Sequence, residues 1–271
     1  MIDRRRFIWT VGRGALAVGV LGVAACGGEG SATGSTLRVT STTGPAGSAA
    51  TTSPTGLAGS TTTGFAADPE GPLAWVEASF VFVSAYILER GGRATIVDTG
   101  VSRGEATLED ALAAFDLGWG EVDHIVLTHH HRDHTGSLGA AAERAPSATL
   151  YAGEADIASI NAPRDLVAVG DRSEVMGLTV IETPGHTVGS ISLLDEASGV
   201  LVAGDALTGG DGGTVTGSNP NFTDDFALAE HSVGKLAGYS FETILFGHGE
   251  PVLTGGSALL AAYAATLSGG Y

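Results

Sequence analysis

The 271-residue sequence has one cysteine, Cys26, and one lysine, Lys235. A disulfide within the chain is excluded, because it needs a second cysteine. Positive charge is scarce as well: 13 lysine and arginine residues stand against 30 aspartate and glutamate residues, giving a formal net charge of −17. A field of that sign repels phosphate backbones. We therefore expect no nucleic acid partner.

Long apolar runs are also missing. The longest apolar stretch near the start, residues 14–25, is shorter than the roughly 20 residues a membrane-spanning helix needs, but it fits the apolar core of a secretory signal. Residues 3–8, DRRRFI, resemble a twin-arginine signal, and residues 23–26, VAAC, resemble a lipobox. We predict that residues 1–25 are an export signal and that Cys26 carries a lipid that anchors an extracytoplasmic protein to a membrane. A plain cleaved signal with an incidental cysteine remains open.

Residues 27–64 are almost entirely Gly, Ser, Thr, Ala and Pro, with Glu29 and Arg38 as the only charges. Such a segment has too little apolar surface to offset the entropy of ordering it. Residues 26–71 are therefore predicted to form the lipidated cysteine and a flexible tether, and residues 72–271 a folded domain.

From residue 72 onward, short β-branched runs alternate with amphipathic stretches, which predicts an α/β domain with a mixed sheet covered by helices. Gly91-Gly92 predicts a hairpin between the first two strands. We expect strands at 80–89, 94–98, 124–128, 149–152, 178–183, 190–195, 200–204 and 243–246. We expect helices at 102–115, 136–144, 224–237 and 257–267.

Metal-capable side chains follow five of these strands directly: Asp98, His129, His186, Asp205 and His248. Loops at the carboxyl ends of strands in a rigid sheet converge on one crevice. The sequence therefore predicts one polar site, built from distant parts of the chain.

The stretch 128–136, THHHRDHTG, is the densest part of this pattern. His129 and His131 are two residues apart and project to the same side of an extended segment, so they can hold one ion. Asp133 and His134 follow, where the chain turns into a helix, and can face a second ion. Imidazoles with a carboxylate suit a zinc-like ion.

HHHRDH matches the H-x-H-x-D-H motif of the metallo-β-lactamase-fold metallohydrolase superfamily, and His186, Asp205 and His248 match its three later ligand positions in order. The chain resembles this superfamily from about Leu73 to its C-terminus, which implies that residues 72–271 are a catalytic domain. The resemblance implies an αββα sandwich, in which two mixed β-sheets are flanked by helices.

The resemblance also implies a ligand set for two Zn²⁺ ions per chain, with Fe or Mn as alternatives. The first ion would be bound by His129, His131 and His186, the second by Asp133, His134 and His248, and Asp205 would bridge them. Asp98 would accept a hydrogen bond that orients a ligand histidine. Asp133 would also orient the attacking water shared by the two ions. His124, His130 and His231 are left outside the site.

Within the superfamily, the sequence resembles the glyoxalase II and lactonase branch, which cleaves esters, thioesters or lactones. No segment after His248 resembles the glutathione-binding helices of glyoxalase II, which counts against that enzyme itself. Three alternatives remain open: a mono-iron persulfide dioxygenase, a β-lactamase, and a tethered metal-binding lipoprotein without turnover. The partner expected is a small-molecule substrate.

Residues 206–223 follow Asp205 and are rich in Gly, Asn and Thr. We predict that they form a substrate loop, with Asn219, Asn221 and Phe222 as contacts, although an ordinary surface loop is equally consistent with the composition. Trp75 and Tyr86 are expected in the core or at its rim rather than in the crevice.

Overall fold

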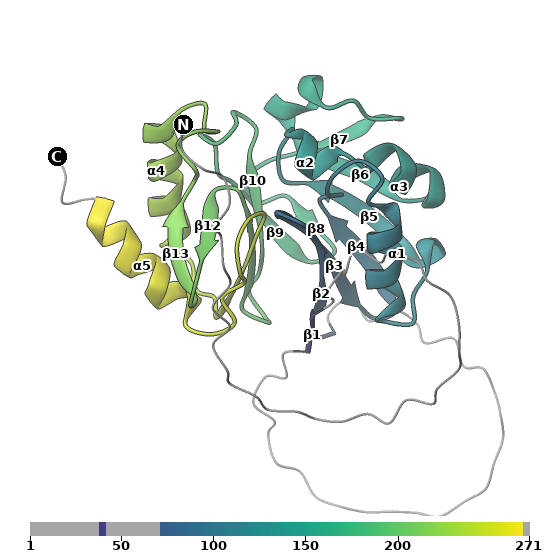
Figure 1. Cartoon of the computed structure of the whole chain (residues 1–271), viewed down its shortest axis with the longest axis horizontal. Coiled ribbons are helices and arrows are strands. Elements are labelled where there is room, and N and C mark those ends of the chain that lie inside the picture. The colour runs from purple at the N-terminus through teal and green to yellow at the C-terminus, as the bar shows by residue number, and fades with distance from the viewer. Residues whose placement is uncertain (1–37, 42–70, 268–271) are drawn as a thin grey trace, which may run out of the picture. The chain divides into compact units, whose positions relative to one another are not determined.

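The computed structural model describes residues 38–41 and 71–267 (Figure 1). The predicted export signal, Cys26 and most of the predicted tether lie outside these residues. Arg38–Ser41 forms strand β1, which pairs antiparallel with β2, Ala74–Phe80. This strand lies within the segment predicted to be a tether. Val39 and Thr40 are β-branched and favour extended backbone, and the edge of β2 offers them hydrogen-bonding partners.

The first sheet has seven strands in the order β1-β2-β3-β4-β5-β6-β7. Strands β1 to β4 are antiparallel neighbours, whereas β4, β5, β6 and β7 run parallel to one another. The remaining strands of this sheet are β3 Val83–Arg90, β4 Arg93–Val97, β5 Val122–Leu127, β6 Thr149–Gly153 and β7 Leu166–Val169.

The second sheet has five strands in the order β14-β11-β10-β9-β8, and a separate hairpin is formed by β12 and β13. Only β11 and β14 are parallel neighbours in it. Its strands are β8 Glu174–Val175, β9 Leu178–Glu182, β10 Ile191–Asp195, β11 Val200–Gly204 and β14 Thr243–Phe246, and the hairpin strands are β12 Leu207–Gly210 and β13 Thr214–Gly217.

Helices cover the outer face of each sheet (Figure 1). On the first sheet, Leu108 and Leu112 of α1 (Glu105–Ala113) and Leu138 of α3 (Leu138–Arg144) join the buried side chains of β2 to β6. On the second, α4 (Phe226–Leu236) and α5 (Gly256–Leu267) pack in the same way through Val233 and Leu260. A third apolar cluster lies between the sheets. The expected αββα sandwich is confirmed.

Trp75 and Tyr86 belong to the cluster between the sheets, and each is 1% exposed. Their rings meet edge to face with centroids 6.1 Å apart. Tyr86 Oη donates to the carbonyl oxygen of Phe246 at 2.8 Å, and burial raises the pKa of Tyr86 well above its ordinary value. Both side chains therefore stabilise the fold and lie outside the crevice, as expected.

Several predicted elements are confirmed and others need correction. The Gly91-Gly92 hairpin connects β3 and β4. The strand predicted at 80–89 is confirmed from Val83 onward as β3, but its predicted start is wrong, because Val81-Phe82 forms a tight turn between β2 and β3. The predicted substrate loop, 206–223, is in part the β12–β13 hairpin. Strands β2, β7 and β8 were not predicted.

The topology brings the chemistry-bearing ends together. Strands β4, β5 and β6 run parallel in the first sheet. In the second, β10 is antiparallel to both β9 and β11, and β11 is parallel to β14, so β9, β11 and β14 share one direction. The loops that follow these strands carry the predicted site residues. In the part of the chain that the structure describes, no helix is long and apolar enough to span a membrane.

Candidate metal centre

The seven predicted ligands lie together at this edge. They form three overlapping groups, in each of which the possible ligand atoms lie within 4.8 Å of one another. They are the first group, His129, His131 and His186; the second group, Asp133, His134 and His248; and a connecting set, His129, His134 and Asp205, which overlaps both. The residues come from the segments after β5, β9, β11 and β14, and α2 (Arg132–Thr135) carries two of them.

Three imidazoles converge in the first group. His186 Nε2 lies 3.0 Å from His131 Nδ1. The ring centroid of His129 lies 4.7 Å from that of His131 and 4.6 Å from that of His186. His129 and His186 are buried, whereas His131 is half-buried at the floor of an open cavity.

The second group combines a carboxylate with two imidazoles. Asp133 Oδ2 lies 3.3 Å from His248 Nε2 and 3.9 Å from His134 Nε2. The Nε2 atoms of His134 and His248 lie 3.4 Å apart. His134 is fully buried, and Asp133 and His248 face the cavity.

Asp205 lies between the two groups. Its Oδ1 is 3.4 Å from His134 Nε2, and its Oδ2 is 3.4 Å from His186 Nε2 and 3.2 Å from His248 Nε2. One carboxylate thus reaches ring nitrogens of both groups, which is the arrangement expected of a bridging ligand.

Hydrogen bonds fix the ring orientation of the histidines that follow β5. Asp98 Oδ2 accepts from His134 Nδ1 at 2.8 Å, as expected of Asp98. Thr128 Oγ1 donates to the same oxygen at 2.8 Å, so it accepts from His129 Nδ1 at 3.1 Å. In both rings the proton is on Nδ1, which leaves Nε2 as the lone-pair donor.

The histidines from the second sheet are oriented in the same way. His248 Nδ1 donates to the carbonyl oxygen of Phe82 at 2.6 Å, and the two rings are stacked with centroids 6.2 Å apart. Thr223 Oγ1 donates to the carbonyl oxygen of Asn219 and lies 3.3 Å from His186 Nδ1, from which it accepts. Both Nε2 atoms therefore face the centre and are the atoms through which these rings can bind a metal ion.

The two groups differ in charge. Burial lowers the pKa of His129 well below its ordinary value and that of His186 to about 4. Burial also lowers the pKa of His248, but hydrogen bonds to Asp133 and Asp205 outweigh it and raise the value to about 10. The first group presents neutral imidazoles. In the second, a metal cation would replace the proton on His248.

The donor atoms fit divalent metal ions. His129 Nε2 and Asp205 Oδ1 are buried without a hydrogen-bond partner among the described residues. Burying unpaired polar atoms costs free energy, and a bound metal ion would offset that cost. Tetrahedral ligands about 2.0–2.1 Å from an ion lie roughly 3.3 Å from one another. The closest ring nitrogens and carboxylate oxygens here are 3.0–3.4 Å apart.

The three remaining histidines lie outside these groups, as expected. His130 Nδ1 is 3.0 Å from Asp156 Oδ2, which gives it a structural contact. His124 meets the ring of Tyr151 edge to face, with centroids 5.5 Å apart. His231 is exposed on α4.

A cavity of about 500 Å³ opens above the centre. Its walls are formed by Phe82, His131, Arg132, Asp133, Asp205, Thr208, Asn219, Phe222 and His248. Of the predicted substrate contacts, Asn219 and Phe222 line this cavity. Asn221 does not, and its amide instead donates to Asn219 Oδ1 at 3.0 Å. Sequence reasoning did not find Phe82, Arg132 or Thr208.

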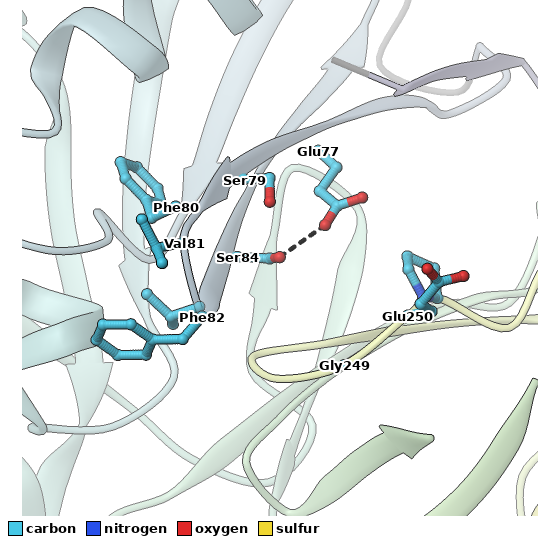
Figure 2. Close-up of a pocket in the computed structure, with 10 residues that line it drawn as sticks. Glu77, Ser79, Phe80, Val81, Phe82, Ser84, Gly249 and Glu250 are labelled. Carbon is cyan, nitrogen blue, oxygen red and sulfur yellow. Dashed lines mark hydrogen bonds between the residues drawn. The ribbon is translucent and has the colours of Figure 1, made fainter. Parts of the chain in front are cut away.

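A second cavity, of about 390 Å³, lies beside the β2–β3 hairpin and shares Phe82 with the first (Figure 2). Ser84 Oγ donates to Glu77 Oε1 across it at 2.7 Å. None of the described residues in its wall is a histidine or cysteine. The first cavity is therefore the one that serves the metal centre.

Comparison with known proteins agrees with this geometry. Residues 78–248, more than half of the chain, match the Metallo-beta-lactamase superfamily. The chain belongs to this superfamily. The match ends at His248, so it includes all seven predicted ligand positions.

Among curated proteins, the chain is 29% identical over 177 residues to the hydroxyacylglutathione hydrolase of Dechloromonas aromatica, covering 63% of this chain and 60% of that one. It is 36% identical over 124 residues to the enzyme of the same name from Klebsiella pneumoniae, covering 45% of each. The chain thus spans about half the length of the curated relatives it matches.

Solved structures show the same fold. A metallo-beta-lactamase family protein from Thermus thermophilus superposes with a TM-score of 0.54 at 24% identity, over 69% of this chain and 75% of that one. The Rm3 metallo-beta-lactamase superposes with a TM-score of 0.56 at 17% identity, over 72% and 90%.

Proposed function

We propose that this domain is a dinuclear metal-dependent hydrolase that cleaves an ester, thioester or lactone. The observation that carries the proposal is the position of Asp205, whose two carboxylate oxygens lie 3.2–3.4 Å from ring nitrogens of His134, His186 and His248. A site for one ion alone would not need a carboxylate that reaches both groups.

His129, His131 and His186 would hold one ion, Asp133, His134 and His248 the other, and Asp205 both. When bound, the ions supply Lewis acidity, which polarises a carbonyl group and acidifies water at neutral pH. The protein keeps the imidazole lone pairs aimed inward through Asp98, Thr128, Thr223 and the Phe82 carbonyl.

Asp133 has a second role in the proposal. It is half-buried and faces the cavity, and the hydrogen bond to His248 lowers the pKa of its carboxyl group. It is therefore a carboxylate at neutral pH and can accept a hydrogen bond from an attacking water. Removing it should lower both metal affinity and turnover.

The cavity supports small acyl substrates. Phe82 and Phe222 form apolar walls, and Thr208 and Asn219 supply neutral polar contacts. The relatives named above are hydroxyacylglutathione hydrolases, which by name act on thioesters. A thioester, an ester or a lactone presents the carbonyl carbon that such a site attacks.

Metal analysis of the purified protein, followed by assays with a thioester, a lactone, a phosphodiester and a β-lactam, tests the proposal. We expect about two zinc ions per chain and hydrolysis of a thioester or lactone that is lost in Asp133→Ala. One iron per chain with oxygen uptake on a persulfide would make the protein a dioxygenase. Hydrolysis of the β-lactam alone would make it a β-lactamase. Bound metal without turnover of any substrate would favour a metal-binding lipoprotein.

We further propose that the enzyme acts outside the cytoplasm, anchored through Cys26. The support is the basic and apolar leader over residues 1–25 and the lipobox-like VAAC. Metabolic labelling with a lipid precursor should mark the wild type and not Cys26→Ser. Unchanged membrane association of Cys26→Ser would rule out the anchor.

A further inference from the structure

Asp156 is a buried acidic residue with no role in the proposed reaction. It lies in the 3-10 helix η2 (Glu154–Ser159), directly after β6, and is 1% exposed. A carboxylate is costly to bury unless several hydrogen bonds compensate for the water it loses. Its partners therefore indicate why an aspartate is placed here.

Three donors surround the Asp156 carboxylate. Oδ2 accepts from the backbone N–H of His130 at 2.9 Å and from Thr187 Oγ1 at 2.6 Å. Oδ1 accepts from the backbone N–H of Gly189 at 2.8 Å. The ring atom His130 Nδ1 also lies 3.0 Å from Oδ2. The carboxylate is thus satisfied through both of its oxygens.

These donors come from the two segments that carry the first group of ligands. His130 lies between His129 and His131, in what we call the β5 loop (residues 128–131). Thr187 and Gly189 follow His186, in what we call the β9 loop (residues 183–190). The contacts of Asp156 therefore connect the segments of the three-histidine group, not those of Asp133 or His248.

The β9 loop is folded around the carboxylate. Because Thr187 Oγ1 donates to Asp156, it accepts from Ser190 Oγ at 2.8 Å, and Ser190 Oγ in turn accepts from the Thr187 N–H at 3.0 Å. Gly189 passes so close that a Cβ atom there would collide with the backbone and side chain of Asp156. The approach leaves little freedom for the loop that carries His186.

We propose that Asp156 is a positioning residue that joins the β5 loop to the β9 loop and so sets the spacing of His129, His131 and His186. His130, which lies between the two ligands His129 and His131, contributes to this connection, because its backbone N–H is the donor from the β5 loop. The inference rests on the proposed metal centre but not on the reaction assigned to it.

Only a carboxylate accepts all three hydrogen bonds, since it has acceptor lone pairs on both oxygens and no proton to donate. Asn in its place turns one oxygen into an NH₂ group. That group faces either Gly189 N–H or the pair of donors from His130 and Thr187, so at least one connection between the loops is lost. Thr187→Val removes one of these bonds while keeping the shape of the side chain.

The test measures zinc binding to the metal-free full-length chain by calorimetry, together with the visible absorption of the Co²⁺-loaded protein. Variants are Asp156→Asn, Thr187→Val and the charge-matched control Asp123→Asn, which lies at the opposite end of β5 in an ion pair with Arg93. Circular dichroism checks that each variant folds.

We expect Asp156→Asn to weaken one of the two zinc-binding steps about tenfold or more, the range typical of residues that orient metal ligands. Thr187→Val should weaken the same zinc-binding step by a smaller factor. The control Asp123→Asn should leave both zinc-binding steps unchanged. A changed Co²⁺ spectrum should accompany the weakened step. Two wild-type zinc steps in both variants, or equal loss of both steps, would overturn the proposal. If Asp156→Asn does not fold, Thr187→Val decides alone. Lack of hydrolase activity would contradict the proposed function but would leave the zinc-binding result for Asp156 valid.

Discussion

Asp98 Oδ2 lies 2.8 Å from His134 Nδ1, and the same oxygen accepts a hydrogen bond from Thr128 Oγ1, which contacts His129. One buried carboxylate therefore orients a histidine of each group. The backbone of Asp98 has a φ of 62°, in the left-handed region that Asp and Asn tolerate better than most residues.

Asp98→Asn should therefore keep the backbone conformation and lose one of two acceptors: the oxygen shared by His134 and Thr128 Oγ1, or the one that accepts from Thr128 N–H. We expect zinc affinity to fall about tenfold to a hundredfold, because residues that hold metal ligands in place typically contribute that much. Competition with a chromophoric chelator measures the change. If this variant binds zinc with wild-type affinity, Asp98 stabilises the turn and does not orient the metal ligands.

Gly247→Ala should damage the centre selectively. Gly247 precedes His248, and a Cβ atom on it would collide with Asp205 Oδ1 and His134 Cε1. We expect a folded protein, by circular dichroism, that binds less than two zinc ions per chain. Gly234→Ala on α4 is the matched control, because a Cβ atom there contacts nothing within 4 Å. Full zinc content in Gly247→Ala would contradict the packing described for this loop.

Arg90 and Asp195 form an ion pair between the two sheets, with nitrogen and oxygen 2.9 Å apart and both side chains 4% exposed. Asp195→Leu leaves the guanidinium of Arg90 uncompensated and should lower the free energy of unfolding by about 3–5 kcal/mol. The double variant Arg90→Met/Asp195→Leu should recover much of this loss. Urea unfolding measures both effects. A double variant less stable than Asp195→Leu would mean that Arg90 stabilises the interface through its other contacts, such as its hydrogen bond to the carbonyl oxygen of Met176.

Arg132 is the one arginine or lysine among the described residues that line the cavity of the metal centre, and it forms no ion pair with another described residue. Arg132→Gln should raise KM for a carboxylate-bearing ester roughly threefold to fivefold, in line with an exposed ion pair, and leave kcat unchanged. A neutral ester of the same size should show no change. Arg172→Gln, at an exposed site away from the cavity, is the control. Equal effects on both esters would exclude a charge contact.

The convergence of the seven ligand residues could be predicted because each follows a strand with a recognisable apolar pattern, and parallel strands end at one edge of a sheet. The hydrogen-bond partners that orient these ligands could not be predicted. Phe82 lies in a turn, Val81-Phe82, that has none of the Gly, Pro, Asn or Asp residues typical of turns. Its carbonyl reaches His248 across 166 residues of sequence.

Asp156 was missed for a similar reason. It lies 26 residues from His130 and 31 residues from Thr187 in the sequence. Strand β1 was missed because four residues within a Gly- and Ser-rich segment are too few to show a period. In each case the decisive partner is distant in the chain, and only the folded structure brings it near.

The proposed function requires that two metal ions at this centre support hydrolysis. The most direct measurement is to remove all metal with a chelator, add zinc stepwise to the dialysed protein, and follow hydrolysis of the best thioester or lactone substrate. We predict no activity in the metal-free protein and a rise that reaches its plateau at about two zinc ions per chain. Activity that persists without metal, or that zinc at two equivalents does not restore, would contradict the account.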